Sequence, residues 1–277
     1  MICGKLSVVL PAHNELENLP GVVERALAVL PELTEGFELV VVDDGSVDGT
    51  TALADELAAK HPQITVVHHP RNRGYGAALT SGFEAASGDR IMFMDADRQF
   101  DIADLSYLAP FVDDYDIVAG YRVARQDAAY RRLYANLFKL AVRVLFGIRL
   151  RDIDCAFKVF RADLLRDAKL ESPGALINTE ILAKARVRGA SWVEVGVNHY
   201  PRAAGTSSGG SPKVVFRAMR ETILLWWRMR TYHPAPSDCS AAGTRPNLLP
   251  GAVIALVVTS LVAAGGLASR LARRRRS

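Results

Sequence analysis

Cysteine is scarce in this chain of 277 residues, and what there is fits no common framework. Cys3, Cys155 and Cys239 are odd in number and lack the C-x-x-C spacing of zinc and redox sites. We therefore expect a reducing compartment, with neither structural disulfides nor zinc. The apolar stretch before Pro11 is too short for a signal peptide. No repeat at solenoid periods occurs, which excludes repeat architectures.

The chain also lacks a large excess of either sign of charge, since the formal net charge is only +4. The basic residues are nevertheless unevenly placed, with clusters at 122–151 and 273–276. Such clusters suit phosphate groups or an anionic membrane surface, and a solvated face is the plain alternative. Aromatic residues do not interleave with them and no nucleic-acid motif is present, so nucleic acid is not expected as a partner.

A long uncharged run occurs only near the C-terminus. Residues 248–268 contain no charge and are long enough to span a bilayer as a transmembrane or anchoring helix. Residues 233–247 are rich in proline, serine and alanine and are read as a linker, and 269–277 form a basic tail. The body, 1–232, is expected to be one catalytic domain with halves at 1–120 and 121–232.

Strand-like and helix-like patterns alternate through the first half. Val- and Ile-rich segments at 6–11, 37–42, 63–68, 91–95 and 116–120 read as strands. Helical patterns fall between them, at 19–30 after Asn18 and Pro20, at 48–60 and at 75–86. This order predicts an α/β fold with a mostly parallel sheet and flanking helices.

The second half begins with a long amphipathic stretch at 131–147 and a helical pattern that stops at Gly189. Residues 192–200 alternate like an exposed strand. The segment 211–230 combines a helical pattern with Trp226, Trp227 and basic residues. It suits a helix at a membrane interface, and packing against the core is an equal alternative.

Two aspartates close the strand at 91–94. Asp95 and Asp97 point the same way because side chains repeat every second residue, and Gln99 is one further alternate position along. Ligands bind at the carboxyl ends of strands in such sheets, and convergent carboxylates suit a hard divalent cation such as Mg²⁺ or Mn²⁺. A helix N-cap would be the alternative for a lone aspartate.

Polar residues also follow the first two strands. Asp43 and Asp44 precede Gly45 and can accept hydrogen bonds from a base or a ribose. Pro11, His13 and Glu15 could line the same pocket. A receiver-domain phosphoacceptor is a weaker interpretation, because it needs no second acidic pair. Dinucleotide binding is also weak, since Gly74-Tyr75-Gly76 lacks the full glycine spacing.

Six motifs in order resemble the family-two glycosyltransferases, which are inverting enzymes of the Rossmann-like GT-A type. More narrowly, they resemble dolichol-phosphate mannose synthase and other polyprenyl-phosphate glycosyltransferases. The resemblance covers about residues 5–230 and rests on PAHNE (11–15), VVDDGSVDGT (41–50), RNRGYGAAL (71–79), DADRQF (95–100), GYR (120–122) and DIDCAFKVF (152–160).

This resemblance assigns roles to individual residues. It implies that the nucleotide sugar is held by Pro11, His13, Glu15, Asp43, Asp44, Arg73, Asp95 and Ala96. It implies metal ligands at Asp95, Asp97 and Gln99, and catalytic roles for Asp97, Arg122 and Arg202. Arg98 departs from the small residue that the family often has there. The stretch 201–213 resembles the family's acceptor loop, although its Gly-Ser run is longer and Pro212 intervenes.

The acceptor is read from what the second half lacks. A sugar hydroxyl needs a general base, and no carboxylate there is a compelling candidate. A phosphate monoester is already ionised near neutral pH and needs only cations to bind it. The candidates for that role are Arg122, Arg131, Arg132, Arg202 and Lys213.

The sequence thus predicts metal-dependent transfer of a hexosyl unit from a nucleotide sugar to a polyprenyl or dolichyl phosphate at the membrane. GDP-mannose is the favoured donor and a UDP-sugar is possible. The alternatives are a saccharide or glycan acceptor, or a membrane-tethered nucleotide-binding partner subunit without catalysis; a protein partner is possible. The catalytic domain is expected on the cytoplasmic side with one C-terminal anchor, although a simple crossing would put the basic tail outside.

Overall fold

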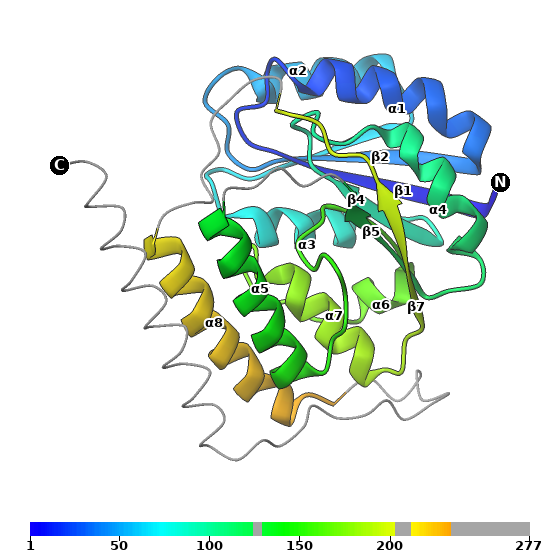
Figure 1. Cartoon of the computed structure of the whole chain (residues 1–277). Coiled ribbons are helices and arrows are strands. Elements are labelled where there is room, and N and C mark those ends of the chain that lie inside the picture. The colour runs from blue at the N-terminus through cyan, green and yellow to red at the C-terminus, as the bar shows by residue number, and fades with distance from the viewer. Residues whose placement is uncertain (124–128, 203–211, 234–277) are drawn as a thin grey trace. The chain divides into compact units, whose positions relative to one another are not determined.

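The computed structural model describes residues 1–123, 129–202 and 212–233, with side chains described outside 129–135 and 212–219 (Figure 1). The chain forms two compact units. The first comprises Met1–Arg125, Arg151–Ile181 and Ala190–Gly205. The second comprises Gln126–Leu150, Leu182–Gly189 and Thr206–Ser277. The predicted split at residue 120 therefore differs from the observed units, because later segments return to the first unit and complete its sheet.

The first unit is built on a seven-stranded sheet of order β3-β2-β1-β4-β6-β5-β7. Every neighbouring pair is parallel except the two that involve β6. The mostly parallel sheet predicted from the sequence is confirmed. The antiparallel β6 was not expected, because its residues were read only as part of a motif. The strands are β1 Ile2–Ala12, β2 Thr34–Asp43, β3 Ile64–His68, β4 Arg90–Met94, β5 Ile117–Arg122, β6 Phe157–Arg161 and β7 Trp192–Val197.

Helices cover both faces of this sheet. In Figure 1, α1, α2 and α4 lie on one face, and α3 and α6 lie on the other. α7 begins in the first unit and ends in the second. The bounds are α1 Leu19–Leu33, α2 Thr50–Lys60, α3 Tyr75–Ala85, the 3₁₀ turn η1 Ile102–Asp104, α4 Leu105–Val112, α6 Ala162–Arg166 and α7 Ile177–Val187.

The central strand β4 is buried on both faces, as its unbroken apolar run predicts. On the α3 side, the Phe93 ring lies 6.0 Å from Phe83 and 5.9 Å from Phe160. Gly82 lets α3 approach closely, because a Cβ there would lie 2.3 Å from Cγ1 of Val9. This packing fixes the height of α3 above β1 and β4, and so the position of its first turn beside the strand ends.

A polar cluster lies toward the amino ends of β1, β2 and β4. Glu38 accepts hydrogen bonds from Nζ of Lys5 at 2.6 Å, Oγ of Ser7 at 2.6 Å and the amide of Ser87 at 2.6 Å. Burial alone would raise the pKa of Glu38, but these hydrogen bonds outweigh it and lower the pKa to about 2. The cluster ties β1, β2 and the turn before β4 together, far along the strands from their carboxyl ends.

The second unit contains α5 (Ala129–Phe146) and α8 (Pro212–Thr231), which pack together. Trp226 is buried, while Trp227 is 57% exposed. The burial of Trp226 agrees with the packing interpretation, and the membrane-interface interpretation stays a prediction. No helix within the described part of the chain is long and apolar enough to cross a membrane. The predicted linker at 233–247, anchor at 248–268 and basic tail at 269–277 fall, from residue 234 onward, outside the described residues.

Candidate active site

The loops that follow β1, β2, β3 and β4 leave the sheet at one edge. In the parallel register Ala12 pairs with Asp43, Asp43 pairs with His68, and Val9 pairs with Phe93. Parallel strands end on the same side, so the polar residues after them converge. The sequence prediction that these segments meet is confirmed.

Asp43 is 1% exposed and is fully used in shaping the turn after β2. Its Oδ1 accepts the amide of Ser46 at 3.0 Å, and its Oδ2 accepts the hydroxyl of Thr51 at 2.6 Å. Burial would raise its pKa, but these hydrogen bonds lower it overall. The carboxylate therefore stays ionised and holds the start of α2 against the end of β2.

Asp44 organises the next loop along the edge. Its Oδ1 accepts the amide of Arg73 at 2.8 Å, and its Oδ2 accepts the amide of Gly74 at 2.9 Å. His69 Nδ1 lies 2.6 Å from the same Oδ1, and both side chains are buried. The carboxylate predicted to hold the nucleotide thus already holds the loop that carries Arg73, which itself lies 3.3 Å from His69 through Nη1 and Nε2.

The loop after β1 contributes the other predicted nucleotide residues. His13 Nδ1 donates to the carbonyl of Asp44 at 2.9 Å, and this bond joins the first loop to the second. Glu15 accepts Nδ2 of Asn18 at 2.6 Å, and burial raises its pKa. Pro11 is half-buried at the end of the strand. These residues form one rim of the site.

The acidic pair forms its floor. Asp97 is 2% exposed, and its Oδ1 accepts the amide of Gln99 at 3.0 Å. Oδ1 of Asp95 is buried and has no hydrogen-bond partner in the described part of the chain. Burial, then the charge of Asp97, raises the pKa of Asp95 to about 7. Ala96 between them is buried at 1% exposure.

Tyr75, the first residue of α3, contacts Asp95 of this pair. Its hydroxyl hydrogen-bonds Asp95, and burial followed by the charge of Asp95 raises the pKa of the phenol well above its usual value. The turn that carries it is pinned by the carbonyl of Pro173, which accepts the amide of Gly76 at 2.8 Å. A Cβ at Gly76 would lie 2.1 Å from the carbonyl oxygen of Ser172, so only glycine fits.

A strap of residues after β7, which we define as 198–202, runs along the acidic loop. Tyr200 donates its amide to the carbonyl of Gln99 at 2.9 Å, and Gln99 Nε2 donates back to the carbonyl of Tyr200 at 3.3 Å. Asn198 is held by the buried Asp104, which accepts its amide at 2.6 Å. At the end of the strap, Arg202 Nη2 donates to Oδ2 of Asp97 at 2.6 Å.

Arg122, predicted to bind the acceptor phosphate, is the last residue of β5 and forms a bidentate pair with Asp152. Its Nε and Nη2 donate to the two carboxylate oxygens at 2.6 and 2.9 Å. Arg131, Arg132 and Lys213 fall in α5 and α8, and their side chains lie outside the described residues. Of the predicted acceptor cations, Arg122 and Arg202 are those whose side chains the structure describes. Each is paired with an aspartate, Arg122 with Asp152 and Arg202 with Asp97.

Lys158 fixes the turn that carries Asp152. It is 1% exposed, and its Nζ donates to the carbonyl of Ile153 at 3.0 Å and to that of Cys155. Burial lowers the pKa of this ammonium. A cation placed on backbone carbonyls compensates for its lost hydration and sets the shape of the turn.

The oxygen-bearing side chains at the acidic loop fit a divalent cation. No group of three or more His, Cys, Asp or Glu side chains in the described ranges is placed to hold a metal. Two carboxylates and one amide oxygen make a set of oxygen donors instead. The partnerless buried Oδ1 of Asp95 is the observation that fits, because such an atom is costly without a ligand. Gln99 uses only its amide nitrogen on Tyr200, which leaves Oε1 to bind.

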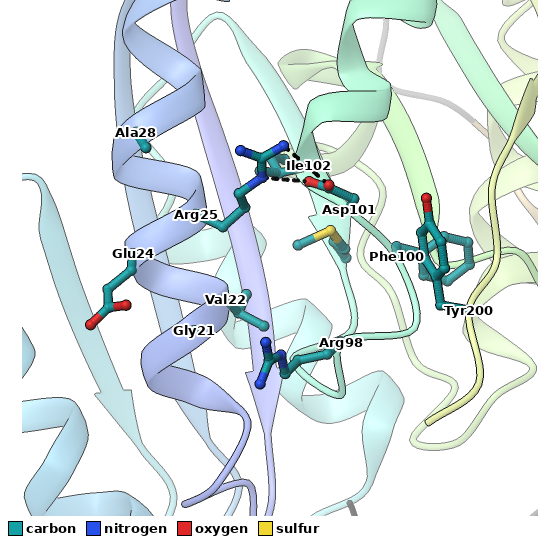
Figure 2. A pocket seen from close by; sticks show the side chains of 11 residues that line it. Gly21, Val22, Glu24, Arg25, Ala28, Arg98, Phe100, Asp101, Ile102 and Tyr200 are labelled. Atoms are coloured by element: carbon teal, nitrogen blue, oxygen red, sulfur yellow. Dashed lines mark hydrogen bonds and ion pairs between the residues drawn. The ribbon is translucent and has the colours of Figure 1, made fainter. Parts of the chain in front are cut away.

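A pocket of about 550 Å³ lies behind the acidic loop, between α1 and the strap (Figure 2). Arg98 lines it in a left-handed conformation with φ of 61°, and its guanidinium packs over Gly21. Figure 2 shows Arg25 joined to Asp101, with distances of 3.0 and 3.2 Å. Arg98 therefore packs against α1. From the sequence, a contact with a phosphate and exposure to solvent were the two alternatives for this side chain.

Sequence reasoning missed three residues of this site: Tyr75, His69 and Asp152. Tyr75 lies inside the motif at 71–79, in which only Arg73 and the glycines were interpreted. His69 follows the third strand, so its place at the shared edge was available from the pattern. Asp152 lay within a quoted motif, but only the fold brings it to Arg122, 30 positions earlier.

Comparison with known proteins identifies the family of this chain. The family model for glycosyl transferase family 2 matches residues 7–169. The undecaprenyl-phosphate 4-deoxy-4-formamido-L-arabinose transferases of Aeromonas hydrophila and Pseudomonas syringae are 33% and 35% identical over 74% and 73% of this chain. The chain spans only 63% and 60% of the length of these two relatives.

Solved structures share the fold at lower identity. Glucosyl-3-phosphoglycerate synthase from Mycobacterium tuberculosis, crystallised with Mn²⁺, UDP and phosphoglyceric acid, is 21% identical with a TM-score of 0.62, covering 89% of this chain and 88% of that one. TarS from Staphylococcus aureus, in complex with UDP-GlcNAc, is 19% identical with a TM-score of 0.54, covering 80% and 66%. Because the family model covers more than half of the sequence, this chain belongs to glycosyl transferase family 2.

Proposed function

We propose that this protein transfers a sugar from a nucleoside diphosphate sugar to a polyprenyl phosphate, with inversion and with the help of a divalent cation. The observation that carries the proposal is the buried acidic pair at the carboxyl ends of the strands, where one oxygen of Asp95 has no hydrogen-bond partner among the described residues. The relatives, which act on undecaprenyl phosphate by name, support the acceptor class.

The donor is bound by the rim and the floor together. The loops at Pro11, His13 and Glu15 face the turn after β2, and the bond from His13 to the carbonyl of Asp44 keeps them in register. Arg73 donates its backbone amide to Asp44, and its guanidinium contacts His69 through Nη1 only. The carboxylates of Asp43 and Asp44 set the pocket's shape, and Oδ2 of Asp44, which accepts one hydrogen bond from the described residues, keeps a lone pair for the nucleotide.

The diphosphate is held over Asp95, Asp97 and Gln99. A bound Mg²⁺ or Mn²⁺ would neutralise the negative charge that gathers on the leaving diphosphate. Tyr75 fixes the orientation of Asp95, and the strap fixes that of Gln99, so both oxygen donors are placed in advance. Preorganised donors lower the barrier because they need no rearrangement as charge develops.

The acceptor needs cations and no base. A polyprenyl phosphate carries its own nucleophilic oxygen, largely ionised near neutral pH. Arg122 keeps one terminal nitrogen free of its bidentate pair with Asp152, and this pair holds the guanidinium at the end of β5. The other acceptor cations, Arg131, Arg132 and Lys213, stay predictions from the sequence.

The sugar is the open choice within this proposal. The narrower resemblance favoured GDP-mannose, whereas the relatives are named for 4-deoxy-4-formamido-L-arabinose. We therefore propose a nucleotide sugar as donor and leave its sugar open. The assay includes UDP-sugars as well as GDP-mannose. The protein would act at the membrane, with the catalytic domain on the cytoplasmic side and residues 248–268 as its anchor. A C-terminal tag that stays protected in right-side-out vesicles would exclude a simple crossing.

An extraction assay on the detergent-solubilised full chain tests the activity. Labelled UDP-N-acetylglucosamine, UDP-glucose or GDP-mannose is offered with Mn²⁺ and either a polyprenyl phosphate or the matching unphosphorylated alcohol. We expect label in the organic phase with the phosphate only, and none after removal of metal. Label transferred instead to a water-soluble glycan would overturn the acceptor, and donor binding without turnover on any acceptor would favour a non-catalytic partner subunit.

A further inference from the structure

Arg202 forms an ion pair with Asp97, one of the proposed metal ligands. Its Nη2 lies 2.6 Å from Oδ2 of Asp97, a side chain that is 3% exposed. The other oxygen of Asp97 accepts the amide of Gln99. The guanidinium, itself 30% exposed, therefore reaches the carboxylate from the open side.

The rest of the strap does not depend on this contact. Tyr200 exchanges two hydrogen bonds with Gln99, and Asn198 donates its amide and its Nδ2 to Asp104 at 2.6 and 3.1 Å. The ring of His199 also lies against Phe100 at 5.1 Å. These ties hold the strap on the acidic loop up to residue 200, so Arg202 can leave Asp97 while the strap stays in place.

The charges around the pair are uneven. Among the largest influences on the pKa of Asp95, the charges of Asp97 and Glu15 raise it and the charge of Arg202 lowers it. A divalent cation bound between Asp95 and Asp97 would lie within a few ångströms of Arg202, and like charges at such a distance repel strongly in a buried site. A diphosphate arriving with the cation adds negative charge and bidentate acceptors for the arginine.

We propose that Arg202 is the resident counter-ion of the acidic pair, which competes with a free divalent cation for Asp97 and moves to the diphosphate when the donor binds. This inference rests on the proposed donor. Its consequence is an order of binding: the site takes metal poorly alone and takes it well together with a nucleoside diphosphate. Arg202 thereby weakens the binding of a divalent cation to the acidic pair until the donor binds.

Binding of Mn²⁺ to the full chain, followed by the loss of the free-ion electron paramagnetic resonance signal, tests the competition without any turnover. For Arg202→Gln we expect Mn²⁺ alone to bind about five- to tenfold more tightly than to the natural protein, since a charge-assisted contact to Asp97 is removed. We expect UDP in saturating Mn²⁺ to bind at least about threefold more weakly, since the diphosphate loses a bidentate partner. Opposite shifts in the two affinities are the signature.

Arg98→Gln is the matched control. It removes the same charge from the residue next to Asp97, but its guanidinium packs over Gly21 in the pocket of Figure 2. We expect its Mn²⁺ affinity to change less than about twofold, because no direct contact is lost. An equal gain of Mn²⁺ affinity in both variants would overturn the proposal in favour of a general charge effect. Arg202→Lys keeps the charge, so we expect its Mn²⁺ affinity to stay near that of the natural protein.

Two results separate this inference from the proposed function. Tighter Mn²⁺ binding by Arg202→Gln with no UDP binding in any variant would support the counter-ion and overturn the donor. Unchanged or weaker Mn²⁺ binding by Arg202→Gln, in a variant whose thermal unfolding matches the natural protein, would overturn the counter-ion while leaving the transferase intact.

Discussion

Replacing Asp44 by asparagine tests whether this carboxylate builds the site or only contacts the nucleotide. The side chain is 5% exposed and accepts three hydrogen bonds from within the protein. Two come from the backbone amides of Arg73 and Gly74, and one involves Nδ1 of His69. The asparagine amide has only one accepting atom, so at least one of these donors faces an N–H group instead.

The cost follows from that count. Loss of a hydrogen bond to a buried charged group costs about 1.5–3 kcal/mol, and the opposed donor adds a desolvation penalty. We expect Asp44→Asn to lower the free energy of unfolding by about 2–4 kcal/mol. For a domain of this size each kcal/mol shifts the melting temperature by about 2–4 °C, so the fall should be about 5–15 °C.

Thermal unfolding without ligand, followed by circular dichroism, measures this directly. Asp55→Asn is the control, because Asp55 is 61% exposed and contacts only His68 in the described part of the chain. It should melt within about 2 °C of the natural protein. If Asp44→Asn also melted within about 2 °C while UDP affinity collapsed, Asp44 would be a nucleotide contact and our account of the loop would be wrong.

Three further predictions concern the same fold. Gly76→Ala should destabilise by about 1–3 kcal/mol despite the better helix propensity of alanine, because its Cβ meets the Ser172 carbonyl, whereas Gly36→Ala, with open space around it, should have little effect; equal melting temperatures would contradict this. Glu38→Gln should cost about 2 kcal/mol at pH 7, and because the folded pKa is lowered, the difference from the natural protein should shrink as pH falls from 4.5 toward 2, as urea unfolding at several pH values would reveal. Asp97→Asn should reduce metal-dependent transfer at least about a hundredfold in the extraction assay, and an undiminished rate in saturating Mn²⁺ would refute its place in the metal site.

Much of the fold followed from the sequence alone, because local pattern and chain order suffice for it. The apolar run before Asp95 predicted a strand buried on both faces, and β4 is that strand. Alternation of strands and helices predicted the parallel sheet. β6 escaped this reasoning because an antiparallel strand between two others leaves no mark on periodicity. Its pairing with β4 and β5 joins residues that are 63–71 and 39–43 positions apart in the chain.

The partners of the site residues could not be predicted in the same way. Nothing in the pattern around Asp97 indicates Arg202, which lies 105 positions later. Arg122 read as a free cation for a phosphate, but it meets Asp152 because β5 and the turn before β6 lie side by side. Polar partners are chosen by proximity after folding, and sequence spacing carries no information on them.

The sequence by itself determined which chemistry is available here: carboxylates after two strands, an amide two positions on, and arginines in the second half. It also determined their placement at one edge, since parallel strands must end together. Only the tertiary structure decided how each group is used. It tied both oxygens of Asp44 to a loop, left Oδ1 of Asp95 without a partner in the part of the chain that the structure describes, and paired Arg202 with Asp97. Order along the chain sets which groups reach the site, and packing in three dimensions sets which of them remain free to bind.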